Sequence, residues 1–287
     1  MNVSPVDRLL RWGFYRYLLG GAPFGRGFLA RHFHAVRLLE PAPDLTCTLR
    51  PDGHGPGGRR VFYLNHPGWW DPLAAAALAR FLAPDRVPAA PIDADALENY
   101  PIVRRLGLFG VERETPAGAR AFLRAAGAVL DDPAGDLWLT PQGTFVAPDA
   151  RPICFAPGLG HLAARDPVLW AVPVAVRYEF WRDRLPELLL AVGDPVRRGD
   201  LEDENGAGVR HGGAGPARGR AGRCSRSLER RLEATLDRLT AAAAARDPAA
   251  FRVIRAGSAG VSAGYDAVRR AAAAARGRPY AAEHGPG

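Results

Sequence analysis

Hydrophobic and polar positions between residues 45 and 195 alternate between two kinds of pattern. Short runs rich in β-branched and aromatic residues are followed by longer runs with helical spacing, which is typical of an α/β domain. The pattern predicts strands at 61–64, 87–92, 108–111, 137–140, 168–176 and 188–192. It predicts helices at 72–82, 94–106, 116–130 and 159–165.

Residues 6–39 have the pattern of an amphipathic helical segment. In its first part the apolar face holds Val6, Leu10, Phe14 and Tyr17, and the opposite face holds Arg8, Arg11 and Arg16. Two interpretations fit this pattern. The segment lies in a membrane interface, with rings at headgroup level and Arg against anionic lipid, or it forms a helical hairpin that packs on the main domain.

The C-terminal third has a different composition. Residues 199–223 are rich in Gly and charge and predict a flexible linker. Helices are expected from Ser225 to about Ala245 and from Tyr265 to Arg276. The expected organisation is therefore a helical membrane-docking segment (1–44), an α/β core (45–198), a linker (199–223) and a C-terminal helical segment (224–287).

Composition narrows the choice of partners and compartment. The chain has 287 residues, 47% hydrophobic content and a net charge of +8, and all 38 basic residues are Arg. This charge favours an anionic partner, either a membrane surface, a polyphosphate-bearing molecule such as coenzyme A, or nucleic acid. The Arg residues are dispersed and no nucleic-acid-binding motif is present, so we expect no nucleic-acid partner.

Three widely spaced cysteines predict neither a metal site nor a disulfide framework, and a reducing compartment fits them best. No run of 18 apolar residues occurs, so neither a transmembrane helix nor a signal peptide is expected. A soluble or peripheral protein is predicted.

The turn from Asn65 to Pro72, between a predicted strand and a predicted helix, contains the strongest candidates for catalytic residues. Functional sites often form where strands of an α/β sheet end. His66 can take a proton near neutral pH, and Asp71, five residues later, can fix its tautomer. The alternative is that Asp71 before Pro72 only caps the helix.

Four segments in order resemble the four blocks of the glycerolipid acyltransferase family, of the 1-acylglycerol-3-phosphate acyltransferase type. The first is the N-H-x4-D box of Asn65–Asp71, and the second is Phe109–Arg113. The third, Leu139–Phe145, is similar to the family's F-P-E-G-T-R, and the fourth, Ala171–Ala175, to its Pro-containing strand. The resemblance covers residues 60–176. It implies a single acyltransferase domain with a mixed central sheet flanked by helices.

The resemblance also implies a mechanism. His66 is the general base on a lipid hydroxyl, Asp71 orients it, and the hydroxyl attacks a thioester without a covalent acyl-enzyme. The acyl donor is acyl-CoA or acyl carrier protein, no other cofactor or metal is implied, and the protein is peripheral on the cytoplasmic face of the membrane. The implied substrate-binding residues are Asn65, Arg113, Gln142, Gly143, Thr144 and Phe145.

Backbone N–H groups around Gly143 are candidates for stabilising an oxyanion, and the alternative is an ordinary tight turn.

Departures from the family pattern remove charge. Gln142 replaces the usual Glu, Phe145 replaces a basic or small polar residue, and Ala156 stands where many members carry Lys. Arg113 is kept, either as an acceptor ligand or as a surface residue paired with Glu112 or Glu114. A dianionic phosphate needs several cationic partners. We therefore expect a glycolipid or related amphiphile as acceptor, with a lysophospholipid or lysophosphatidic acid as the close alternative.

Two other functions are compatible with parts of the sequence. Gly260–Gly264 matches the G-x-S-x-G pattern of serine hydrolases, with Ser262 as the nucleophile, but only Asp266 and His284 follow it and no sheet remains to hold a triad. A lipid-binding protein without catalytic activity is the second alternative. A binding protein needs no base, so the intact His66 and Asp71 favour an enzyme.

Overall fold

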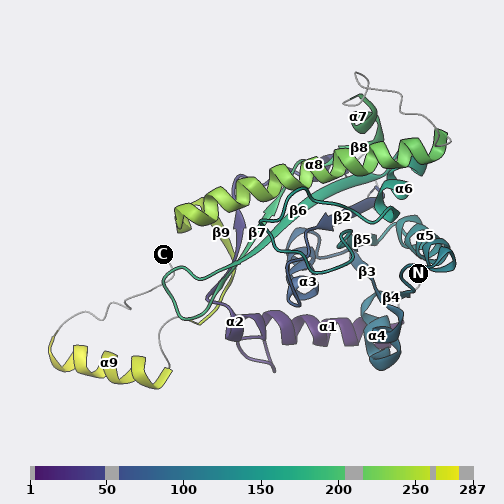
Figure 1. Cartoon of the computed structure of the whole chain (residues 1–287). Helices are drawn as coiled ribbons and strands as arrows, with labels where there is room; N and C mark the ends of the chain where they lie inside the picture. The colour runs from purple at the N-terminus through teal and green to yellow at the C-terminus, as the bar shows by residue number, and fades with distance from the viewer. Residues whose placement is uncertain (1–3, 49–57, 204–215, 259–262, 278–287) are drawn as a thin grey trace.

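A computed structural model of the chain describes residues 4–48, 58–203, 216–258 and 263–277. It has a mixed sheet of nine strands in the order β4-β3-β5-β2-β6-β7-β1-β9, with β8 paired to β6 (Figure 1). The strands are β1 (Ala35–Leu39), β2 (Arg60–Leu64), β3 (Val87–Asp93), β4 (Leu108–Val111), β5 (Gly135–Leu139), β6 (Trp170–Glu179), β7 (Glu187–Val192), β8 (Val196–Arg197) and β9 (Phe251–Ala256).

The predicted mixed α/β architecture is confirmed, and all six predicted strands are present.

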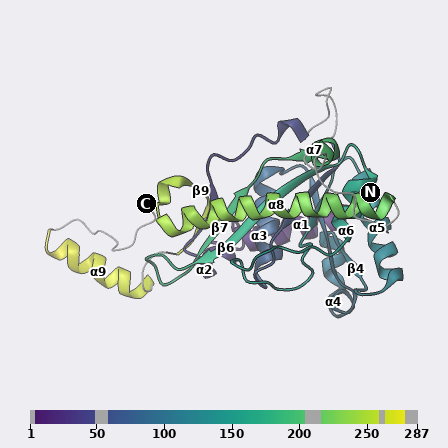
Figure 2. The same ribbon diagram turned by 45° about the horizontal axis from the view of Figure 1, so that its top comes forward.

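Helices cover both faces of this sheet. The α-helices of the described residues are α1 (Pro5–Leu19), α2 (Leu29–His32), α3 (Asp71–Leu82), α4 (Ala94–Asn99), α5 (Pro116–Asp131), α6 (Gly158–Arg165), α7 (Arg198–Asp203), α8 (Pro216–Ala245) and α9 (Ala263–Ala275). The long helix α8 crosses one face together with α5 and α6, while α1, α2 and α3 lie on the other (Figures 1 and 2).

Strand β2 explains this layering. Val61 and Tyr63 pack into the core beneath α5, α6 and α8, whereas Phe62 and Leu64 pack into the core beneath α1, α2 and α3. All five residues of β2 are buried. A central parallel strand buried on both faces has the continuous apolar sequence seen here.

Four strands place their carboxyl ends at one edge of the sheet. β2 pairs in parallel with β5, β5 with β3, and β3 with β4. The segments that follow these strands therefore meet at the same edge. These segments contain the box after β2, Asp93 at the end of β3, Arg113 after β4 and the Gly143 turn after β5.

The helical prediction for residues 6–39 is wrong in its second half. Helix α1 ends at Leu19, α2 has only four residues, and Ala35–Leu39 forms β1, which is buried throughout. β1 lies between β7 and β9, so residues 1–44 and 224–287 each contribute a strand to the central sheet. A five-residue apolar run cannot be assigned to helix or strand by its periodicity alone.

Two further boundaries differ from the sequence-based prediction. The expected linker, 199–223, is helical at both described ends because it contains parts of α7 and α8, and residues 204–215 lie outside the described part. The helix predicted at 94–106 is divided into α4 and a 3₁₀ helix, η2 (Pro101–Leu106). Pro101 causes this division because it disfavours helical geometry at Tyr100 and donates no backbone hydrogen bond.

Candidate active site

His66 and Asp71 form a hydrogen-bonded pair where β2 passes into α3. His66 Nδ1 lies 2.6 Å from Asp71 Oδ2. The Asp71 side chain is fully buried, while His66 keeps 17% of its side chain exposed. A carboxylate only accepts hydrogen bonds, so in the neutral imidazole Nδ1 carries the hydrogen and Nε2 has the lone pair. The pair thus has the arrangement of an oriented base.

Two other donors hold the Asp71 carboxylate. Gly68 N donates to Oδ2 at 3.0 Å, and the hydroxyl of Tyr178 on β6 donates to Oδ1 at 2.5 Å. Burial, and secondly the Asp71 carboxylate, raises the pKa of Tyr178 well above its ordinary value. The phenol therefore stays protonated and remains a donor throughout the neutral and mildly alkaline range.

Tyr178 was not predicted from the sequence. It lies 107 residues from Asp71, and only the parallel pairing of β2 with β6 brings the two side chains together. A tyrosine on a strand is ordinarily a packing residue, and no local motif distinguishes it. A predicted pairing of β2 with β6 was the one signal that could have indicated it.

The helix-cap alternative for Asp71 is wrong. The residue preceding α3 is Trp70, and the structure has no side-chain cap at this end of the helix. Asp71 is the first helical residue, and its oxygens are directed back to His66, Gly68 and Tyr178.

The turn after β5 fixes the backbone of His66. Gln142 Oε1 accepts a hydrogen bond from His66 N at 2.8 Å, and Val146 N donates to His66 O at 2.9 Å. The Phe145 ring lies edge-on to the imidazole, with 4.6 Å between ring centroids. Gln142 is therefore a backbone contact of His66, and Phe145 forms one wall beside it.

Gly143 has a φ of 72°, which favours glycine. Its own N–H donates to Thr140 O at 3.0 Å and is not free for an oxyanion. Within the described residues, the next two amides, of Thr144 and Phe145, have no protein acceptor. The amides of this turn that have no protein acceptor are therefore those of Thr144 and Phe145, rather than that of Gly143.

Asn65 is buried and bridges two strands. Its Nδ2 donates to Val176 O at 2.9 Å, and its Oδ1 accepts from Val176 N at 2.8 Å. The amide therefore holds β6 against the end of β2, which also helps to place Tyr178. Its expected contact with substrate stays a prediction.

Arg113 contacts neither of the two expected carboxylates. Its Nε and Nη2 donate to Asp93 Oδ2 at 2.9 and 2.6 Å, and its Nη1 donates to Gly143 O at 2.7 Å. The expected pairing with Glu112 or Glu114 is therefore wrong. The correct partner ends β3, the neighbouring strand.

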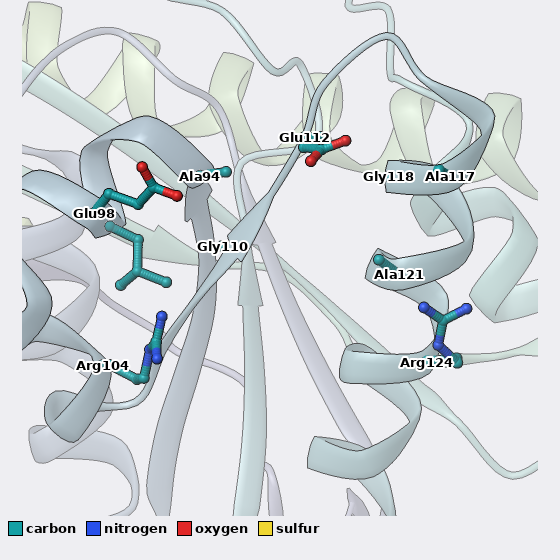
Figure 3. Close-up of a pocket in the computed structure, with 10 residues that line it drawn as sticks. Ala94, Glu98, Arg104, Gly110, Glu112, Ala117, Gly118, Ala121 and Arg124 are labelled. Atoms are coloured by element: carbon teal, nitrogen blue, oxygen red, sulfur yellow. The ribbon is translucent and has the colours of Figure 1, made fainter.

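A surface pocket of about 390 Å³ lies between α4, β4 and the first half of α5. Gly110 on β4 lies between its two walls, with Glu98 and Arg104 on one side and Arg124 of α5 on the other (Figure 3). Glu112 also lines it, whereas His66 and Asp71 do not. Glu112 and Arg113 thus diverge, one toward the pocket and the other toward the Gly143 turn.

No known family model and no curated protein matches the chain.

The serine hydrolase alternative falls largely outside the described residues. Ser262 and His284 lie in segments that the structure does not describe. Asp266 belongs to α9, which lies apart from the sheet in both views (Figures 1 and 2).

Proposed function

We propose that this protein is an O-acyltransferase that moves a fatty acyl group from a thioester to the hydroxyl of a lipid acceptor. The observation that carries the proposal is the fully buried Asp71 carboxylate, which accepts hydrogen bonds from His66, Gly68 and Tyr178. Burying a carboxylate is costly unless hydrogen-bond donors satisfy it, and one of the three donors here is an imidazole ring. The carboxylate orients this imidazole, whose Nε2 is available as a base.

The proposed chemistry uses this geometry. The acceptor hydroxyl gives its proton to Nε2 of His66 while its oxygen attacks the thioester carbonyl carbon. The C–O bond forms, the C–S bond breaks with its electron pair going to sulfur, and the imidazolium returns the proton to the thiolate. The free amides of Thr144 and Phe145 are the donors for the oxygen that becomes negative in between.

The surroundings of His66 suit an amphiphilic substrate. Phe145 beside the imidazole is 63% exposed, and Trp69 in the same box is 66% exposed. Large apolar side chains so accessible at a site favour contact with hydrocarbon or with a sugar face. They are of little use to a small, highly polar substrate.

The test is direct transfer by the purified protein. Labelled palmitoyl-CoA and palmitoyl-acyl carrier protein are offered with neutral glycolipid, lysophospholipid and lysophosphatidic acid acceptors, and acylated products are measured by mass spectrometry. We expect thioester-dependent acylation of at least one acceptor. Lipid binding without transfer from either donor would instead support the non-catalytic alternative.

Helix α1 supports a membrane-associated setting for this reaction. Its inner side packs against α3 and η2, and its outer side exposes Val6, Leu9, Trp12 and Tyr17, next to the exposed Arg8 and Arg16. One side of α1 therefore packs on the domain, and the other side is free for the membrane contact that we propose. Among the described helices, none is long and apolar enough to cross a membrane.

We predict that the double substitution Leu9→Gln and Trp12→Gln weakens binding to anionic vesicles by about tenfold or more, since two apolar side chains no longer enter the interface. Sedimentation with phosphatidylglycerol vesicles measures this, and binding of the wild type should also weaken as salt rises. Val168→Gln, at an exposed valine before β6, is the matched control. Equal binding by the double variant and the wild type would contradict the docking role. Deleting residues 1–40 is unsuitable because it removes β1 from the sheet.

A further inference from the structure

Arg113 is largely committed to protein contacts at the edge of the site. A guanidinium has five N–H groups, and three of those of Arg113 already serve Asp93 and the carbonyl of Gly143. The hydrogen bonds from Arg113, followed by one from the Asp95 amide, lower the pKa of Asp93 below its ordinary value. Asp93 is therefore charged at neutral pH and offsets the charge of Arg113.

The bond to Gly143 O has a consequence for the next amide. In a planar trans peptide the carbonyl and the following N–H point in opposite directions. Arg113 holds Gly143 O at 2.7 Å, so the N–H of Thr144 is directed away from Arg113. The same turn carries Gln142, which holds His66 N, and Phe145, which touches the imidazole. Fixing this one peptide therefore fixes a candidate oxyanion donor relative to the base.

The charges around Arg113 disfavour a second anion. Residues 93–95 and 112–114 contain the carboxylates of Asp93, Asp95, Glu112 and Glu114 and the single guanidinium of Arg113. Asp93 contacts Arg113 directly, whereas Glu112 faces the pocket. A phosphate monoester carries close to two negative charges near neutral pH. A phosphate placed here is repelled by the Asp93 carboxylate and finds only the two N–H groups of Arg113 that Asp93 and Gly143 do not use.

We propose that Arg113, held by Asp93, is a positioning residue for the Gly143–Thr144 peptide and does not bind acceptor phosphate, so that the preferred acceptor carries no phosphate near its reacting hydroxyl. This inference rests on the proposed acyl transfer and names its acceptor class. Asp93 is then a specificity determinant, because it offsets the charge of the guanidinium that would otherwise receive a phosphate.

The experiment compares two acceptors that differ only in the phosphate, 1-oleoylglycerol and 1-oleoyl lysophosphatidic acid, with the same acyl donor. For the wild type we expect kcat/KM to be about tenfold higher for 1-oleoylglycerol. Arg113→Ala should lower kcat roughly 10- to 100-fold for both acceptors, with little change in KM, since it loosens an oxyanion donor. Asp93→Asn should shift the preference several-fold toward lysophosphatidic acid because it leaves the charge of Arg113 unbalanced.

Glu98→Gln is the matched control. It removes an exposed carboxylate of α4 on the pocket side of the segment (Figure 3) and should leave the acceptor preference within about twofold. The inference is overturned if the wild type prefers lysophosphatidic acid and Arg113→Ala raises KM for that acceptor alone.

Equilibrium binding of both lipids to the same proteins separates this inference from the proposed function. If neither acceptor nor any other lipid is acylated, the proposed function fails. Tight lysophosphatidic acid binding that Arg113→Ala abolishes would still overturn the inference, and binding unaffected by Arg113→Ala would support it.

Discussion

The substitution His66→Ala is expected to lower the rate of acyl transfer by roughly 10²- to 10⁴-fold, the usual contribution of a positioned general base. The alcohol then has no group to take its proton as it attacks. His66 keeps part of its side chain in contact with solvent and its backbone bonds to Gln142 and Val146 do not need the imidazole, so the fold should be retained. Steady-state transfer assays and thermal unfolding of the purified variant measure both effects.

His161→Ala is the matched control for this experiment. His161 lies on α6, on the face of the sheet opposite α3, and is partly buried like His66. It should retain nearly full activity. A His66→Ala protein with most of the wild-type rate would rule out the base mechanism, and added imidazole that restores part of the lost rate would support it.

The second large effect is expected for Asp71→Asn, which should also reduce transfer by roughly 10²- to 10⁴-fold. Asparagine has nearly the same shape and can still face Gly68 and Tyr178 through its oxygen and amide groups. It supplies no negative charge for the imidazolium that forms when His66 accepts a proton. The loss should therefore appear in kcat with little change in the thermal unfolding midpoint.

Asp85→Asn, at an exposed aspartate in the turn after α3, provides the comparison and should behave like the wild type. A lost helix cap would not explain a loss of activity, because Asp71 makes no cap at the start of α3. Full activity of Asp71→Asn would mean that the buried carboxylate serves only to hold the turn together.

The elements that could be predicted from the sequence are those whose pattern lies within a short stretch of the chain. Strand β2, the turn from Asn65 to Asp71 and helix α3 each have a pattern contained within a dozen residues, so periodicity and turn chemistry were sufficient. The proximity of His66 to Asp71 was predictable for the same reason.

The contacts that were missed join segments far apart in the chain. Tyr178 reaches Asp71 across 107 residues, and Asp93 reaches Arg113 across 20. Which of several nearby carboxylates Arg113 selects depends on the order of β3, β4 and β5 in the sheet, and hydrophobic patterning does not specify that order. Strand β1 was missed because its five apolar residues fit a helix as well as a strand.

The position of β1 between β7 and β9 has a consequence for the order in which the protein folds during synthesis. β2 to β6, which carry the site residues from His66 to Tyr178, are contiguous in the chain apart from their helices. β1 leaves the ribosome before the other strands, but its partners β7 and β9 begin at Glu187 and Phe251. β1 therefore has no strand to pair with through most of translation. Closing such long loops is slow, and an unpaired apolar strand is prone to aggregate. The strand has no sheet partner until residue 192 has been made, and one of its edges stays unpaired until residue 256.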